Sequence, residues 1–206
     1  MKNLYITKMI ELAKIYLDAG QSHKERVAKL EKANEIGTIS PIDYKAQQEA
    51  LTAEAAESRT SFAQDIDTVL SEYAERVNLW AQLRGEDLPA DVALLSSGIV
   101  IDENDLNVLS QRYHNNYTVQ RVLSDYAQRN QVIYAPAPTA EMKIKSMGEL
   151  AGFVKGAQDH GYAAMFIQTD DALADYLAGY ESILGDGSEL PTLTSATDST
   201  ASNATA

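Results

Sequence analysis

The chain has 206 residues, of which 45% are hydrophobic and 23% charged, close to the composition of a soluble globular protein. It contains no cysteine, which excludes disulfides, thiolate metal sites, iron–sulfur clusters and cysteine nucleophiles. It carries 17 basic and 30 acidic residues, for a net charge of −13, so most of its surface would repel nucleic acid and anionic membranes.

The sequence gives no sign of export or of a membrane span. No apolar run approaches the roughly 18 residues that a membrane span needs. Charged residues interrupt the N-terminal segment too early for a secretory signal. We therefore expect a protein made in the cytoplasm, with neither nucleic acid nor membrane as a direct partner.

Residues 3–35 predict a first helix, because apolar side chains recur at helical spacing along its first half. Gly20, Gln21 and Ser22 predict a kink or break, because glycine is a poor helix residue and serine favours caps. Gly37 suits the left-handed residue that commonly follows a helix C-terminus.

A second helix is predicted from Ser40, which precedes Pro41 at the first helical position and an acid, Asp43, three residues after the cap. No proline or glycine follows until Gly85, a length of roughly 65 Å at about 1.5 Å per residue. The spacing of its apolar residues is typical of a coiled-coil seam. This apolar line comprises Tyr44, Leu51, Ala55, Phe62, Ile66, Val69, Tyr73, Val77, Trp80 and Leu83.

About five residues connect these helices, which makes them antiparallel neighbours in a long hairpin. The open end of the hairpin is too apolar for two helices to bury alone. A third element must cover it, either the rest of this chain or another subunit. The residues that we expect there to mediate protein interaction are Phe62, Ile66, Val69, Tyr73, Val77 and Trp80.

The remainder of the chain predicts shorter elements. They are a short helix over 89–95, an extended piece over 99–101, a helix capped by Asp102, a helix from Thr118, an extended stretch over 132–138, a helix over 140–158, an apolar piece over 163–168 that is strand or helix, and a last helix from Asp170 or Asp171.

Together these elements predict an all-α fold. A long, coiled-coil-like helical hairpin occupies residues 1–88, a segment of short helices 89–134, and a C-terminal helical pair 135–186. Residues 187–206 are acidic and rich in serine and threonine, and they predict a disordered tail.

No catalytic, cofactor-binding or metal-ligating set stands out. His23, His114 and His160 are dispersed, and none has another histidine at ligand spacing. Residues 102–105 resemble the start of a calcium loop, but Asn107 replaces the required glycine, and a helix N-cap explains them better. We expect no cofactor, no metal and no enzyme activity. The glycines at 148, 152 and 156 recur every four residues and predict a close helix contact or a weak helix.

One segment carries a family resemblance. Residues 94–101 (LLSSGIVI), followed by Asp105-Leu106 and residues 113–118 (YHNNYT), resemble uncharacterised helical proteins from the head-morphogenesis region of tailed phages of Gram-positive bacteria. The resemblance covers roughly residues 30–130. It implies a virion or assembly role and no role for individual residues. Phage scaffolding proteins usually end in a basic helix that binds the coat protein, whereas this chain ends in an acidic segment.

Two functions follow as hypotheses. The first is a non-enzymatic phage structural or assembly protein, in the virion or the host cytoplasm, which binds itself as a homo-oligomer and other phage structural proteins. The second is an acidic DNA mimic or inhibitor that binds a basic host protein. This hypothesis is based on the net charge of −13.

Overall fold

The computed structural model describes residues 3–85, 88–159, 162–188 and 190–191. Throughout these residues the regular secondary structure is helical and no strand occurs, so the predicted all-α fold with a long helical hairpin is confirmed. The chain forms two compact units. Unit 1 comprises residues 1–73 and 141–187, and unit 2 comprises residues 74–140 and 188–206.

The two units differ from the four predicted segments. The hairpin and the C-terminal helices, which the sequence predicts as separate segments, belong together in unit 1. The boundary expected near residue 88 falls instead after Tyr73, inside the second long helix. Most of the tail predicted for 187–206 lies outside the described residues.

Helix α1 spans Leu4–Glu35 and begins at an asparagine cap, where the side chain of Asn3 accepts a hydrogen bond from the backbone N–H of Tyr5. It ends at Glu35, and Gly37 just beyond it adopts a left-handed φ of +71° as predicted. The N–H groups of Gly37 and Thr38 donate to the carbonyls of Asn34 and Ala33, which is the Schellman pattern. The chain is thereby reversed within a few residues.

The predicted break at Gly20 is wrong, because α1 runs through it without interruption. A glycine inside a helix costs about 1 kcal/mol relative to alanine. Buried contacts on its N-terminal side outweigh that cost. Leu17 lies in the core, and the ring of Tyr16 stacks on Phe62 with the ring centroids 4.6 Å apart.

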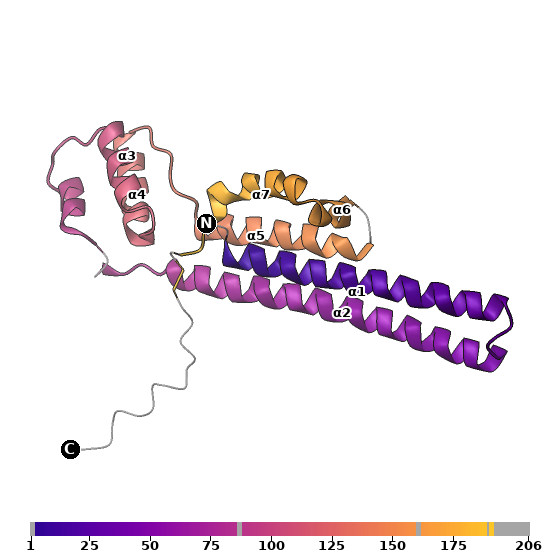
Figure 1. Ribbon diagram of the computed structural model, residues 1–206. Coiled ribbons are helices and arrows are strands. Elements are labelled where there is room, and N and C mark those ends of the chain that lie inside the picture. The colour runs from indigo at the N-terminus through magenta and orange to yellow at the C-terminus, as the bar shows by residue number, and fades with distance from the viewer. Residues whose placement is uncertain (1–2, 86–87, 160–161, 189, 192–206) are drawn as a thin grey trace, which may run out of the picture. The chain divides into compact units, whose positions relative to one another are not determined.

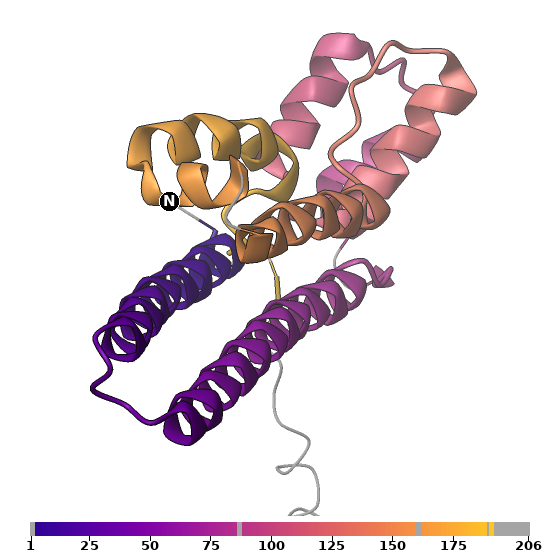
Figure 2. The ribbon, with the colours of Figure 1, turned by 90° about the vertical axis from the view of Figure 1, so that its right-hand side faces the viewer.

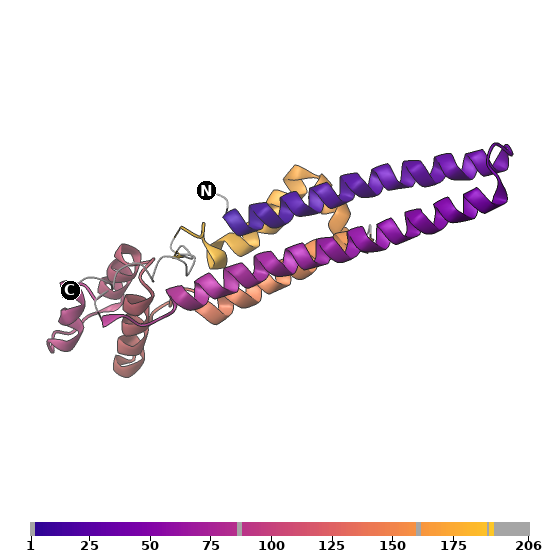
Figure 3. The ribbon, with the colours of Figure 1, turned by 90° about the horizontal axis from the view of Figure 1, so that it is seen from below.

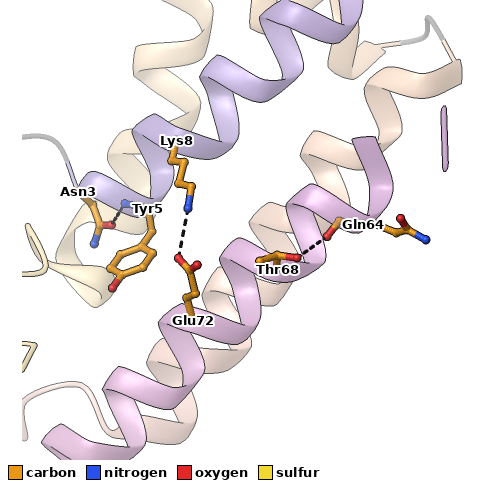
Figure 4. A network of polar contacts seen from close by, with 6 residues as sticks. All are labelled: Asn3, Tyr5, Lys8, Gln64, Thr68 and Glu72. Carbon is orange, nitrogen blue, oxygen red and sulfur yellow. Dashed lines mark hydrogen bonds and ion pairs between the residues drawn. The ribbon is translucent and has the colours of Figure 1, made fainter. Parts of the chain in front are cut away.

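Helix α2 spans Pro41–Trp80 and runs antiparallel beside α1 (Figure 1). The predicted cap is present, since Ser40 Oγ accepts a hydrogen bond from the N–H of Asp43. Polar contacts also link the two helices along their length. Lys8 Nζ lies 3.2 Å from Glu72 Oε2, close to the Asn3 cap (Figure 4), and Arg26 pairs with Glu54 farther along.

The C-terminal helices of unit 1 form a second layer over the hairpin. They are α5 (Ala140–Lys155), the 3-10 turn η3 (Gly156–Asp159), α6 (Tyr162–Gln168) and α7 (Asp170–Leu184). Figure 2 shows this layer lying over α1 and α2. Figure 3 shows that it follows only the part of the hairpin remote from the turn. The turn end therefore consists of two helices alone.

Two polar side chains join the end of α7 to the rest of unit 1. Lys143 on α5 is only 5% exposed, and its ammonium group donates to the carbonyl of Leu184. A cation at a helix C-terminus is favourable because the carbonyls there carry partial negative charge. The side-chain amide of Asn3 donates to the carbonyl of Gly185 beside it. The first and last helices of unit 1 thus meet at one end.

Unit 2 contains the last turns of α2, the 3-10 helix η2 (Ala90–Ser96), α3 (Glu103–Arg112) and α4 (Tyr117–Asn130). Asp102 caps α3 as predicted, since its side chain accepts from the N–H of Asp105. Asn116 caps α4 in the same way. The core of this unit comprises Val92, Ile101, Leu106, Leu109, Val119, Leu123 and Ala127.

The hairpin gives a matched pair for a stability test. Ile66 is 0% exposed and Ile42 is 81% exposed, and both lie on α2. We expect Ile66→Ala to lower the free energy of unfolding by about 2–5 kcal/mol, because it leaves a cavity. Ile42→Ala should change it by less than about 0.5 kcal/mol. Urea unfolding followed by far-UV circular dichroism checks both, and equal effects would contradict the assignment of Ile66 to the core.

Candidate protein-interaction surfaces

The structure buries five of the six residues that the sequence indicated for protein interaction. None of the five is more than 4% exposed, and they are Phe62, Ile66, Val69, Tyr73 and Val77. A side chain buried in its own chain offers no area to a partner. These five residues therefore belong to the core of the single chain rather than to a surface between subunits.

Aromatic rings and the C-terminal helices account for this burial in unit 1. The ring of Tyr5 meets Tyr73 edge-on at 5.2 Å, and Tyr16 covers Phe62. Two ion pairs join the second layer to α2. Lys155 of α5 pairs with Asp67, and Asp159 of η3 accepts from the guanidinium of Arg59 at 2.8 Å. The covering element that the sequence left open is thus supplied by this chain.

The sixth residue, Trp80, has a different role within unit 2. Its indole N–H donates to the carbonyl of Asn115 at 3.1 Å, and its ring meets Tyr117 edge-on at 5.0 Å. The N–H of Arg84 donates to the hydroxyl of Thr118, a few residues farther along both segments. These contacts join the end of α2 to the turn between α3 and α4. They also border a cleft of about 250 Å³.

A larger, mainly apolar groove of about 530 Å³ lies between η2 and α4 in unit 2. Its lining includes Leu88, Val92 and Leu95 on one side and Val122 and Tyr126 on the other. Asp125 and Arg129, which form an ion pair on α4, lie at its polar side. A groove of this composition suits the apolar side chains of another protein.

Exposed apolar side chains concentrate in the same segment. Between residues 88 and 100, Leu88, Leu94, Ile99 and Val100 are all exposed, and Val100 reaches 88%. Single exposed apolar residues are ordinary on a protein surface. Four within thirteen residues, next to an apolar groove, are typical of a protein-binding surface. We call residues 88–100, together with the groove, the η2 surface.

The η2 surface rests on a hydrogen-bonded support. The side chain of Gln120 is buried, and its amide donates to the carbonyls of Ser110 and Tyr113 at 2.9 and 3.0 Å. Its oxygen accepts from the hydroxyls of Ser110 and Tyr134 at 3.0 and 2.9 Å. All four hydrogen-bonding positions of this amide are thereby used. The network joins α3, α4 and the extended segment after α4.

Asp91 ties η2 itself to α3. Its carboxylate accepts from the hydroxyl of Tyr113 at 2.9 Å and from the guanidinium of Arg112 at 2.6 Å. The tyrosine hydrogen bond, followed by that of the arginine, lowers the pKa of the Asp91 carboxyl below its ordinary value. The same hydrogen bond, together with burial, raises the pKa of Tyr113. Tyr126 adds a further contact by accepting from the N–H of Ile101.

The exposed apolar residues of unit 1 include Leu4 and Ile15 on α1 and a pair at the hairpin turn. Ile36 and Ile42 flank Gly37 and are both largely exposed. No second-layer helix covers this end of the hairpin (Figure 3). The turn is therefore a second, smaller candidate contact.

The acidic side chains of α2, all of which the structure describes, are partly neutralised within the chain. Of the eight acids on this helix, at least four form ion pairs with basic side chains of the same chain. They are Glu49, Glu54, Asp67 and Glu72. This internal pairing reduces the free negative charge that a basic partner would meet.

The other sequence features are not brought together into one site. Among the described residues, no group of three or more His, Cys, Asp or Glu side chains is placed to hold a metal ion. His23 lies on the hairpin and His114 at the end of α3, while His160 lies outside the described residues. Among the spaced glycines, a side chain added at Gly156 would lie 3.5 Å from Ala163 on α6, whereas one added at Gly148 or Gly152 would meet nothing within 4 Å.

None of the helices in the described part of the chain has the length and apolar character needed to cross a membrane. Comparisons of the chain with protein-family models, with curated proteins and with solved structures find no match.

The Gln120 network gives a second testable expectation. Gln120→Leu leaves buried carbonyls and a hydroxyl without their partner, so we expect it to lower the free energy of unfolding by at least about 2 kcal/mol. Gln128→Leu, at an exposed position on the same helix, should change it by less than about 0.5 kcal/mol. Urea unfolding of both variants measures the difference. Equal values would mean that the network adds nothing to stability.

The Asp91 contact predicts a pH dependence. Because the pKa is lowered in the folded state, the contact stabilises at pH values above the ordinary aspartate pKa of about 3.9 and is lost as pH falls through the folded pKa. Asp91→Asn should therefore lower the urea midpoint near neutral pH, and this difference should shrink in acid.

The control for this prediction is Asp125→Asn, which disrupts an exposed ion pair with Arg129 and should have little effect at any pH. Urea midpoints of the wild type and both variants from about pH 6 to about pH 3 are compared. A constant difference between wild type and Asp91→Asn would contradict the role of the ionised carboxylate.

Proposed function

We propose that this protein is a non-enzymatic structural or assembly protein that works by docking to other proteins, of the kind found in the heads of tailed phages. The observation that carries the docking role is the η2 surface of unit 2, where exposed apolar side chains border an apolar groove. The phage context rests on the resemblance of residues 94–118, which include much of that surface.

Its partners in this proposal are a second copy of the chain and other phage structural proteins, in the virion or the host cytoplasm. Apolar burial drives such docking at about 25 cal/mol per Å² of area removed from water. Among the exposed residues Ile99 and Val100 contribute the most available apolar surface. They adjoin Ile101, which is buried and anchored through its N–H to Tyr126. The apolar pair is therefore held in place before a partner binds.

A pre-formed surface of this kind favours assembly. Ordering a mobile loop on binding costs conformational entropy, which weakens an interface of given area. The Asp91 contacts hold η2 against α3, and the Tyr126 hydroxyl accepts a hydrogen bond from the backbone of Ile101. By contrast, at least half of the acids of α2 are paired internally, so the inhibitor hypothesis receives less support than docking does.

The test is the mass in solution, measured by light scattering across a series of protein and salt concentrations. We expect a defined oligomer that persists in high salt, because the contact is apolar rather than ionic. Val100→Asp should shift the equilibrium toward monomer by at least about tenfold in dissociation constant, since a buried, unpaired charge costs more than 1.4 kcal/mol.

The matched control is Ile133→Asp, which places the same charge at another highly exposed apolar position in unit 2. It should leave the mass unchanged. A monomer of wild-type protein at every concentration, or equal effects of the two variants, would contradict self-association through the η2 surface. A phage head protein that is recovered with the wild-type chain but not with Val100→Asp would be the docking partner.

A further inference from the structure

The hairpin turn of unit 1 presents two isoleucine side chains to solvent. Ile36, just after α1, is 64% exposed, and Ile42, in the first turn of α2, is 81% exposed. The second layer of helices ends before it reaches this turn (Figure 3). We call the turn with its two isoleucines the isoleucine tip.

The isoleucine tip is ordered without a partner. The N–H groups of Gly37 and Thr38 donate to carbonyls at the end of α1, and the Thr38 hydroxyl donates to the carbonyl of Ala33 at 3.0 Å. On the other side of the turn, Ser40 caps α2. Binding therefore does not have to order this turn, which avoids the entropy that a mobile loop would lose.

Lysines share a helix face with both isoleucines. Lys29 and Lys32 precede Ile36 by seven and four residues, so the three side chains lie within about 60° of one another around the helix axis. Lys45 follows Ile42 by three residues, about 60° away around α2. All three lysines are exposed. The tip thus combines apolar side chains with positive charge.

The acids of the tip lie on other faces of the two helices. Glu31 and Glu35 are about 140° and 100° from Ile36 around the helix axis. Asp43 is about 100° from the isoleucine before it, and its carboxylate accepts a hydrogen bond from the Ser40 hydroxyl at 2.7 Å. A partner that meets the isoleucines therefore meets lysines beside them.

The η2 surface carries the opposite charge. From residue 85 to residue 111 the sequence has six acids and no base. Asp102, Glu103 and Asp105, which follow the exposed apolar pair at 99 and 100, are all exposed. Two η2 surfaces facing each other would bring like charges together, which opposes binding. The isoleucine tip instead offers apolar side chains together with the complementary charge.

The groove of the η2 surface has room for the tip. Its volume is about 530 Å³, whereas a cavity of about 150 Å³ already holds a molecule of the size of benzene. Tyr126 lines the groove, and its hydroxyl accepts from the N–H of Ile101. Val100 and Asp102, on either side of Ile101 in the chain, therefore adjoin the groove. Two isoleucine side chains fit the groove while lysines beside them reach the acids at its edge.

From these observations we propose that the isoleucine tip of one copy of this chain docks on the η2 surface of a second copy. Ile36 and Ile42 enter the groove, and Lys29 and Lys32 face the acids at the start of α3. The apolar side chains supply the affinity, and the charges set the orientation. The inference rests on the proposed function and names the surface that meets the η2 surface in self-association.

Such a contact is heterologous, because each copy contributes a different surface. Every copy has one tip and one η2 surface, so copies add head to tail. A heterologous contact closes into a ring of fixed size or continues as an open filament. A symmetric contact between two identical surfaces would stop at a dimer, and this difference makes the proposal testable.

Complementation between two variants tests the polarity. Val100→Asp disables the η2 surface and keeps the tip, whereas Ile42→Asp disables the tip and keeps the η2 surface. Each variant alone should weaken self-association by at least about tenfold in dissociation constant, because a charge would be buried without a partner. An equimolar mixture should form a heterodimer with twice the 22.5 kDa mass of the chain in light scattering, since one intact tip meets one intact η2 surface.

The matched control is Ile15→Asp, because Ile15 is 66% exposed on the same hairpin and lies away from the turn. This variant should associate like the wild type. Ile42→Asp should stay folded, because an acid in the first turn of a helix interacts favourably with the helix dipole. Far-UV circular dichroism checks the fold of all three variants.

Two outcomes would overturn the proposal. If Ile42→Asp associates like the wild type while Val100→Asp is weakened, the η2 surface mediates self-association without the tip. If each variant alone is monomeric and their mixture stays monomeric, the contact is not head to tail. A wild-type chain that is monomeric at every concentration instead contradicts self-association itself, so failure of the proposed function is distinguished from failure of the tip.

Discussion

The apolar face of α2 is the constraint on which unit 1 depends. From Phe62 to Tyr73 this face is wider than α1 alone can cover, and leaving it in water would forfeit about 1.5–3 kcal/mol for each large side chain. The chain therefore returns after residue 140 and lays α5, α6 and α7 over the hairpin. Where that face ends, toward the turn, the second layer ends too, and Ile36 and Ile42 remain exposed.

Local interactions explain why so much of the fold follows from the sequence. The caps at Ser40 and Asp102 and the left-handed Gly37 each involve partners within a few residues, so the sequence alone specifies them. Lys143 is the counterexample. The structure buries this lysine and exposes the neighbouring, apolar Met142, the reverse of what the polarity of the two side chains favours. The carbonyl that binds Lys143 lies 41 residues away, and no local pattern reveals it.

The candidate sites, too, have features that the sequence predicts and features that it does not. Apolar spacing correctly indicates that Phe62, Ile66 and Val69 are buried, because periodicity reports which face avoids water. It does not report whether the covering surface belongs to the same chain. The η2 surface lacks periodicity altogether, since it lies in a 3-10 helix and a loop. The available signal was the apolar triplet 99–101 after a glycine, which predicts an extended piece and is silent on exposure.

Unit 2 combines two requirements that ordinarily oppose each other. A docking surface must leave apolar side chains in water, and a small unit has few apolar residues to spare from its core. Here the core of unit 2 is supplemented by polar contacts, namely the fully hydrogen-bonded amide of the buried Gln120 and the more exposed carboxylate of Asp91. Satisfied buried networks fix one arrangement of the elements more narrowly than apolar contacts do. Asp91 holds η2 on one side of Ile99 and Val100, and the Tyr126 hydroxyl holds Ile101 on the other, while both apolar side chains stay in water. The proposed docking needs such a segment to be held before a partner binds, because ordering it on binding would cost entropy.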